Sequence, residues 1–262
     1  MPSAHLLYTE EMYKHFGYLA TWAPNVTVDV GHVGVLKDRV FECTSTLSDK
    51  GITFQTRSDR SYADFEYTSA DGVTIKVKGA GEAPMAGSVI AQADAGVSYF
   101  FHNENAVVFQ ATHCREKSIL DQDSLGKQIL SLYEKGKWPE ELVIVTNVIA
   151  SQSTTILISS STSGAMEFTI DASLNPGSAV QIANLGSGLK VARSSNIGTK
   201  IIGTRGLTPL FKAAGIKKRL MRKGGDWVRR GEDKGLAQLP GANAFAAAPA
   251  TRFDEIAFDD FD

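Results

Sequence analysis

The amino-acid sequence predicts an α+β fold, in which a twisted, largely antiparallel β-sheet carries a few flanking helices, a basic C-terminal helix and an acidic tail. Short runs of alternating apolar and polar residues recur between residues 26 and 191, and this period of two is typical of strands with one buried face. Apolar residues recur at helical spacing in only a few segments. Charged residues separate into a basic block and an acidic tail near the C-terminus, which indicates further units after the main domain.

The composition excludes several classes of protein. With 43% apolar residues among 262, the chain can bury a core, so wholesale disorder is excluded and one large domain is expected. The net charge of −2 favours neither nucleic acid nor membrane as a general partner. Only Cys43 and Cys114 are present, which excludes a disulfide framework or zinc spacing and predicts a cytoplasmic location. We expect neither a secretory signal nor a membrane helix, because the sequence lacks both patterns.

The first part of the chain predicts one short helix followed by hairpins. Thr9 suits a helix cap and Gly17 suits a helix end, so we expect a helix between them. Residues 26–30 alternate Val with polar residues and predict a strand. A turn at residues 37–38 predicts a hairpin, and the Asp-Gly pair at residues 71–72 predicts another.

The second part predicts two helices around a buried strand. An apolar stripe at helical spacing between residues 118 and 135 predicts a helix that Ser118 or Asp123 could cap and that ends at Gly136. The run at residues 142–149 is apolar on both faces, which predicts a central strand covered on both sides. Thr208 followed by Pro suits a helix start, so we expect a basic helix from Thr208 to Lys223.

The charge distribution divides the chain into four parts. An α+β domain is expected over residues 1–211. The basic helical segment, residues 212–234, carries nine Lys and Arg against three acidic residues. A flexible linker of small residues is expected over 235–251, and an acidic-aromatic tail over 252–262.

Two sets of residues are candidate contact residues. The basic set would contact an anionic membrane or a partner, with Trp227 at a lipid headgroup layer or stacked on a base. The tail set would dock its apolar side chains on a basic, apolar groove. The basic set comprises Lys212, Lys217, Lys218, Arg219, Arg222, Lys223, Trp227, Arg229 and Arg230. The tail set comprises Phe253, Ile256, Phe258 and Phe261.

Residue types that carry catalysis form no complete constellation. His113 and Cys114 are adjacent, so on a strand their side chains point to opposite faces and do not form a nucleophile and base. Asp121 and Asp123 could bind a metal, but they also suit the cap and first turn of the following helix, which we favour. Residues 79–87 are glycine-rich but lack the ending of a phosphate-binding loop.

His102 lies in a polar hairpin tip without a second cluster of metal ligands. We therefore predict no catalytic, cofactor-binding or metal-binding residues, and a protein that is not an enzyme. A catalytic site scattered through the sequence would escape this reasoning.

The order of elements in the centre of the chain resembles that of the pore-forming domain of gasdermins. Small-residue and alternating segments at 93–97 and 106–109 precede a helix around 125–133, and the strand VIVTNV at 143–148 follows. The resemblance covers about residues 70–185.

The sequence also departs from that family. Asn147 stands where gasdermins usually have Glu, and residues 21–56 match no part of the family. Bacterial members carry a lipid-modified cysteine very near the N-terminus, whereas the first cysteine here is Cys43. Animal members carry a large inhibitory C-terminal domain, whereas this chain has only a short tail. Small bacterial and fungal members have short tails or none, so the short tail is compatible with the family.

The resemblance implies a protein that is soluble until activated, forms homo-oligomers and opens pores in anionic membranes. The acidic-aromatic tail would mask the basic helix, and an unidentified protease or partner would release it. Residues 88–111 and 142–170 are long enough for membrane-spanning strands, which need about 9–11 residues and must close on themselves to bond every backbone group. The same alternation also describes ordinary sheet strands.

Two other functions remain open. The chain could be a non-enzymatic binding or assembly module, whose tail docks on a neighbouring subunit or a partner. Nucleic acid binding through the basic block is the weaker alternative, because the rest of the chain is acidic.

Overall fold

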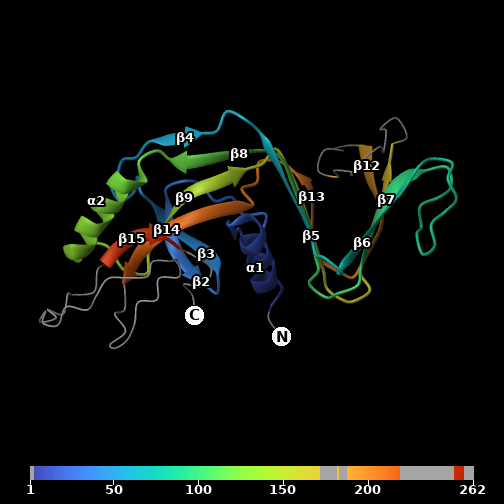
Figure 1. The fold of residues 1–262 in the computed structure, drawn as a ribbon, viewed down its shortest axis with the longest axis horizontal. Helices are drawn as coiled ribbons and strands as arrows, with labels where there is room; N and C mark the ends of the chain where they lie inside the picture. The colour runs from blue at the N-terminus through green and yellow to red at the C-terminus, as the bar shows by residue number, and fades with distance from the viewer. Residues whose placement is uncertain (1–2, 172–181, 183–187, 219–250, 257–262) are drawn as a thin grey trace, which may run out of the picture.

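The computed structural model describes residues 3–171, 182, 188–218 and 251–256, which form a mostly antiparallel β protein (Figure 1). Of these residues 48% lie in strands and 14% in helices, so the α+β class expected from the sequence is wrong. The two helices of the described part are α1 (Ala4–Phe16) and α2 (Gln122–Glu134). Its strands are β1 (Leu19–Ala20), β2 (His32–Lys37), β3 (Val40–Thr46), β4 (Thr56–Ser58), β5 (Ala63–Thr68), β6 (Val73–Lys78), β7 (Ala95–Phe101), β8 (Val107–Ile119), β9 (Val143–Ala150), β10 (Ser153–Ser159), β11 (Ala165–Ile170), β12 (Leu189–Ser195), β13 (Ile197–Thr204), β14 (Leu210–Lys218) and β15 (Thr251–Glu255).

The strands form two sheets. The large sheet has eleven strands, and its main path runs in the order β1-β14-β9-β8-β10-β13. Outside this path, β15 pairs with β14, the β2–β3 hairpin pairs with β9, and β4 and β5 pair with β8. The small sheet has the order β12-β11-β7-β6. The strands pair antiparallel in both sheets.

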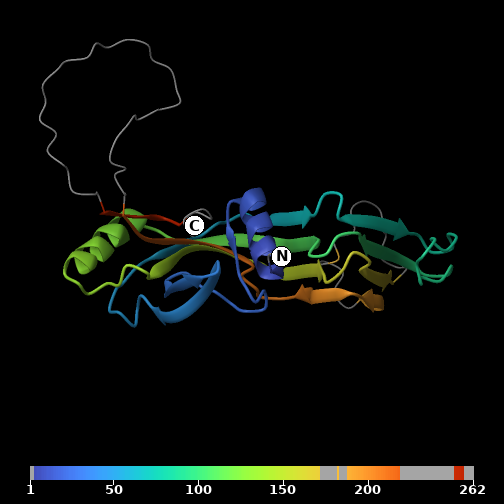
Figure 2. The ribbon, with the colours of Figure 1, turned by 90° about the horizontal axis from the view of Figure 1, so that it is seen from below.

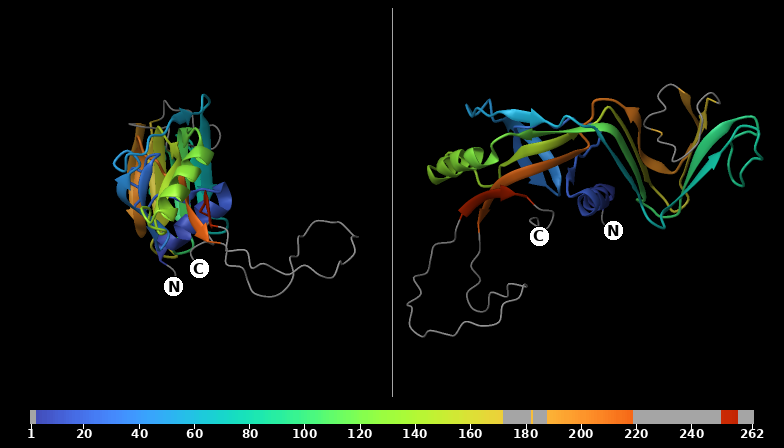
Figure 3. Two further views of the ribbon diagram at one scale, coloured as in Figure 1. Left: turned by 90° about the vertical axis from the view of Figure 1, so that its left-hand side faces the viewer. Right: turned by 45° about the horizontal axis from the view of Figure 1, so that its top comes forward.

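The two sheets meet at a sharp corner because four chain segments run through both of them (Figure 1; Figure 3, right). β5 continues into β6, β7 into β8, β10 into β11 and β12 into β13, and the order of the strands is the same on each side. The chain changes direction at residues 69–72, 102–106, 160–164 and 196. The result is four long antiparallel strands that are all bent at one level.

Left-handed backbone conformations lie at this corner. Asp71, Asn105 and Asn196 have φ angles of 56°, 63° and 52°, a region that Asp and Asn tolerate better than other non-glycine residues. The fourth bend passes through Gly164, where a Cβ would lie 3.0 Å from the carbonyl oxygen of Asn196. The bends also bond to one another, since the Asn105 N–H donates to the Ser159 carbonyl at 3.1 Å.

Three apolar cores hold the elements together. α1 lies against the middle of the large sheet (Figure 2), where Tyr8 and Met12 are fully buried with side chains from β8 and β10. Ile129 of α2 packs into a second core with the β2–β3 hairpin, β9 and β14. The third core joins the two sheets at the corner, where Val108 of the large sheet clusters with Phe168 of the small one.

The first helix and first strand differ in part from the expectation. α1 begins at Ala4 rather than at Thr9, whose Oγ1 donates to the His5 carbonyl at 2.9 Å within the helix. The expected end is confirmed, because Gly17 has a left-handed φ of 72° immediately after the helix. The strand expected at residues 26–30 is wrong, since this segment is irregular although two of its three Val side chains are buried.

The expected hairpin at residues 33–41 is confirmed as β2–β3, with left-handed turn residues Asp38 and Arg39. Residues 71–72 do not join a hairpin, because β5 and β6 pair with different strands and this turn belongs to the corner. The central strand expected at 142–149 is confirmed as β9, between β8 and β14.

The cap of the second helix is Asp121 rather than Ser118 or Asp123. The Asp121 carboxylate accepts a hydrogen bond from the Ser124 N–H at 2.9 Å, and Asp123 lies in the first turn of α2. These two residues therefore have the structural roles that we favoured over metal binding.

The basic C-terminal helix is wrong where the structure describes this region, because Leu210–Lys218 is strand β14. Thr208 does not cap a helix; its hydroxyl accepts a hydrogen bond from the Val28 N–H at 2.8 Å. Almost every residue from 210 to 216 is buried, and a continuous apolar run fits a central strand as well as a helix. The expected domain boundary after residue 211 falls inside β14, and residues 219–223 lie outside the described part.

Candidate functional site

The tail strand β15 completes the edge of the large sheet beside α2 (Figure 1). It pairs with β14 so that Phe253 lies opposite Ile216. Ile256 follows the strand, is 8% exposed and joins the core that contains α2. Its N–H donates to the Ala213 carbonyl at 2.8 Å. β15 therefore covers backbone groups that β14 would otherwise present at an open edge.

Phe253 packs in a notch on α2. A Cβ at Gly126 would lie 3.1 Å from Cδ1 of Phe253, so the absence of a side chain at Gly126 makes room for the ring. Farther along the strand, Lys212 Nζ lies 3.2 Å from Oε1 of Glu255. This ion pair is partly exposed, so it contributes at most about 1 kcal/mol. Strand pairing and two apolar side chains hold the tail strand.

The structure describes a minority of the predicted contact residues. Lys212, Phe253 and Ile256 come together around β14 and β15, and Lys217 is partly buried on β14. Lys218 ends β14, and only its backbone is described. The predicted residues outside the described part are Arg219, Arg222, Lys223, Trp227, Arg229, Arg230, Phe258 and Phe261.

A polar network that the sequence did not indicate lies next to Lys212. The Tyr18 hydroxyl donates to Oε2 of Glu116 at 2.6 Å, and the Asn147 amide donates to the other oxygen of that carboxylate. Lys212 Nζ lies 5.2 Å from the centre of the Tyr18 ring. Burial, followed by the hydrogen bond to Glu116, raises the pKa of Tyr18 above its ordinary value. These residues are far apart in the sequence, so no local pattern links them.

The bent strands expose two open edges that differ in charge. Within the described residues, β5 and β6 each pair with one neighbour only, and so do β12 and β13. The β5–β6 edge carries Asp64 and Glu66 on β5 but Lys76 and Lys78 on β6, whereas the charged residues of the β12–β13 edge are all basic, Lys190, Arg193 and Lys200. Open edges of this kind bond readily to another strand.

The cysteine that the sequence placed beside a histidine is chemically inert. Cys114 is 2% exposed, and burial together with the charge of Asp64 raises its pKa to about 12. A neutral thiol is a poor nucleophile. His113 is exposed and has a left-handed φ of 50°, with its N–H donating to Asp64 at 2.8 Å.

The other residues considered for metal or phosphate binding do not form such a site in the described part of the chain. His102 Nε2 lies 2.8 Å from the Thr74 hydroxyl at the corner. Residues 79–87 belong to the β6–β7 loop and precede a strand rather than a helix. Among the described residues, no three His, Cys, Asp or Glu side chains are grouped as metal ligands would be.

No protein-family model matches the chain, and no curated protein matches it. In the described part, neither helix has the length and apolar character needed to cross a membrane. The fold and its contacts are therefore the basis for the proposed function.

Proposed function

We propose that this protein is a gasdermin-like pore-former, a non-enzymatic cytoplasmic protein that forms homo-oligomers on anionic membranes once its tail strand is released. The observation that carries the proposal is the row of four antiparallel strands that bend together at one corner. If the corner straightened, the four bent strands would form one continuous sheet of two long hairpins.

The lengths of the bent strands suit this change. The outer two span residues 63–78 and 189–204, and the inner two span residues 95–119 and 153–170. A tilted strand crosses a bilayer with about 9–11 residues, so each straightened segment is long enough. Backbone groups in lipid must all be bonded, so the outer strands would need partners from neighbouring copies.

The two open edges support head-to-tail assembly of identical copies. The β5–β6 edge of one copy, which is acidic on β5 only, would pair with the basic β12–β13 edge of the next. Such a contact joins different surfaces, so it leads to a ring when the rotation between copies closes.

The tail strand supplies a form of control. β15 adds to β14 only through residues 251–256, and residues 219–250 separate the two strands in the sequence. A cut within the expected linker, residues 235–251, would leave β15 attached by non-covalent contacts alone. Its loss would expose the edge of β14 and free Lys212 from Glu255 to contact anionic lipid.

Dye leakage from vesicles of phosphatidylcholine and phosphatidylserine tests the proposal. The full-length chain would carry a protease site within residues 235–251 and the substitution Cys43→Ser. We expect leakage only after cleavage. A matched control adds Ala214→Cys and Glu255→Cys, which face each other across β14 and β15, so that a disulfide retains the tail after cleavage.

The control should leak only when reductant is added. Cleaved protein that is folded, has lost β15 and neither oligomerises nor permeabilises these vesicles would contradict the proposal.

One observation favours the alternative of a binding or assembly module. β15 adds to a sheet edge, which is a common way for one chain to bind another. In that case β15 of one copy would pair with β14 of a second copy. Light scattering should then show dimers that disappear when residues 251–262 are deleted, with no leakage from either form.

A further inference from the structure

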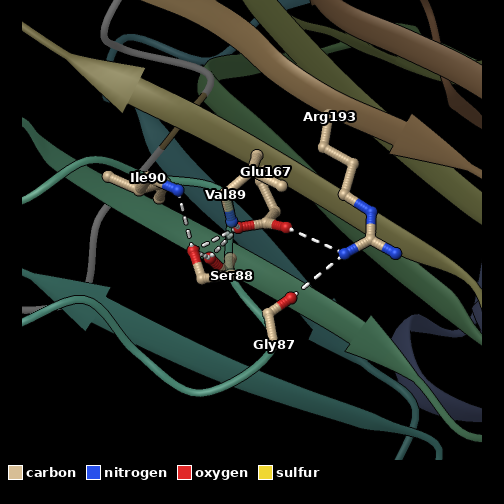
Figure 4. Close-up of polar contacts among 7 residues, drawn as sticks. Gly87, Ser88, Val89, Ile90, Glu167 and Arg193 are labelled. Carbon is tan, nitrogen blue, oxygen red and sulfur yellow. Dashed lines mark hydrogen bonds and ion pairs between the residues drawn. The ribbon is translucent and has the colours of Figure 1, made fainter.

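A fully buried carboxylate on β11 holds the β6–β7 loop, residues 79–94, against one face of the small sheet (Figure 4). Oε2 of Glu167 accepts hydrogen bonds from the Val89 N–H at 3.1 Å and from the hydroxyls of Ser88 and Ser98, the latter at 3.0 Å. The side chain of Glu167 is 0% exposed. Three donors therefore converge on one oxygen, and two of them belong to the loop.

Arg193 on β12 adds a second contact to the same segment. Its Nη1 lies 3.4 Å from Oε1 of Glu167 and donates to the Gly87 carbonyl at 3.0 Å (Figure 4). Glu167 and Arg193 face each other across the pairing of β11 and β12. Side chains of the β11–β12 hairpin thus hold the loop of the β6–β7 hairpin.

A buried lysine holds the base of the loop, where its two ends join β6 and β7. Lys78, the last residue of β6, is 1% exposed, which is rare for lysine because a buried ammonium group must be compensated by hydrogen bonds. Its Nζ donates to four backbone carbonyls at 2.7–3.2 Å, those of Gly79, Ala91, Gln92 and Asp94.

An apolar residue fills the space between these two polar contacts. Ile90 is 1% exposed and lies directly over Gly96 of β7, where a Cβ would come within 2.6 Å of Cδ1 of Ile90. Ile90 therefore anchors one part of the loop on the sheet, whereas most other residues of the loop are exposed. Most loops keep their polar groups in water, so burial of two charged groups under one loop requires an explanation.

We propose that Lys78, Glu167 and Arg193 form a latch that keeps the β6–β7 loop on the sheet and couples the two hairpins, so that they are released together. When the loop leaves, Lys78 loses the carbonyls of Ala91 and Gln92 and Glu167 loses two of its donors, which makes release cooperative. This latch is separate from the tail strand. Its effect on leakage rests on the proposed pore function, whereas its effect on the loop does not.

Hydrogen exchange of the full-length protein tests the latch without a membrane. Glu167→Gln and Lys78→Met preserve side-chain size and remove the charge. We expect amide exchange in residues 79–94 to become at least tenfold faster in each variant, while exchange in the β2–β3 hairpin stays unchanged. Glu141→Gln and Lys137→Met are matched controls at exposed positions and should leave the loop unchanged.

A coupled latch makes a sharper prediction for Arg193→Met. This substitution lies on the β11–β12 hairpin but should accelerate exchange in residues 79–94 of the other hairpin. Exchange in that loop within twofold of the unaltered protein, in folded Glu167→Gln and Lys78→Met variants, would overturn the proposal.

A disulfide tests the latch even if the charge variants do not fold. The hydroxyls of Ser88 and Ser98 lie 3.4 Å apart, so Ser88→Cys with Ser98→Cys should form a disulfide that fixes the loop to β7. After tail cleavage, the oxidised protein should not leak vesicles and the reduced protein should. Equal leakage in the oxidised and reduced states would overturn the latch. No leakage in either state, together with fast loop exchange in Glu167→Gln, would contradict only the pore function.

Discussion

Two segments of this protein fold back onto a sheet, and opposite kinds of contact hold them. The tail strand β15 is held by strand pairing and by the apolar side chains of Phe253 and Ile256. The β6–β7 loop is held by the buried charged groups of Lys78 and Glu167. Strand pairing needs only an open edge, so a second strand can replace the tail. Buried charges need particular partners, so the loop has one place to bind.

The difference matters because the two segments are also connected differently. We expect the tail strand to leave without moving any other element, and one cut in the chain before it removes its covalent connection. The β6–β7 loop is continuous with a strand at each end, so no single cut separates it from the sheet. The tail strand suits control by a protease or partner, and the loop suits control by conformational change.

The largest expected effect is at the buried carboxylate. Glu167→Ala leaves Arg193 and the hydroxyls of Ser88 and Ser98 without their acceptor, and a lost partner in a buried ion pair typically costs about 3 kcal/mol of stability. Arg193 is partly exposed, so water compensates some of this loss. We expect the free energy of unfolding in urea to fall by about 2–3 kcal/mol.

Ile256→Ala provides the comparison at the tail strand. A buried Ile normally costs about 2–5 kcal/mol when truncated to Ala. Here the loss cannot exceed the free energy with which the tail strand docks, because the rest of the molecule can stay folded without it. A fall in global stability as large as that of Glu167→Ala would show that the tail strand belongs to the cooperative core and would remove the contrast.

An intermediate effect is expected at the corner between the two sheets. Asn105 has a left-handed φ of 63°, and a β-branched residue is strained there. Asn105→Val should lower the free energy of unfolding by about 1–2 kcal/mol, whereas Asn105→Gly should change it by only a few tenths. Thermal unfolding of both variants measures the difference, and equal stability would mean that the bend does not depend on this conformation.

The sequence correctly predicted those features that depend only on residues close together in the chain. The β2–β3 hairpin, the left-handed Gly17 and the roles of Asp121 and Asp123 at the start of α2 each depend on a few neighbouring residues, and the structure has them. β14 was wrongly expected to be helical because Thr208 and Pro209 imitate a helix start and the following apolar run fits both elements. The choice of strand depends on β9 and β15, which lie far away in the sequence.

The corner and the latch were beyond sequence reasoning for the same reason. Asp71, Asn105 and Asn196 are individually ordinary turn residues, and only strand pairing shows that they lie at one level. Glu167 occupies a polar position in an alternating strand, which predicts exposure to water. It is buried because a loop about 80 residues earlier in the chain covers that face. Alternation identifies the two faces of a strand but not what covers them.

The smallest expected effect, and the most specific, is at Gly126 of α2. Alanine is favoured over glycine within a helix by about 0.5–1 kcal/mol. The new methyl group, however, would lie 3.1 Å from the Phe253 ring and crowd the tail strand. In a chain that ends at Lys234, Gly126→Ala should therefore raise stability by about 0.5–1 kcal/mol. In the full-length chain the gain should shrink or reverse, and amide exchange in β14 should accelerate. An equal gain in both chains, measured by urea unfolding, would show that Phe253 moves aside without loss and that the notch does not help to hold the tail strand.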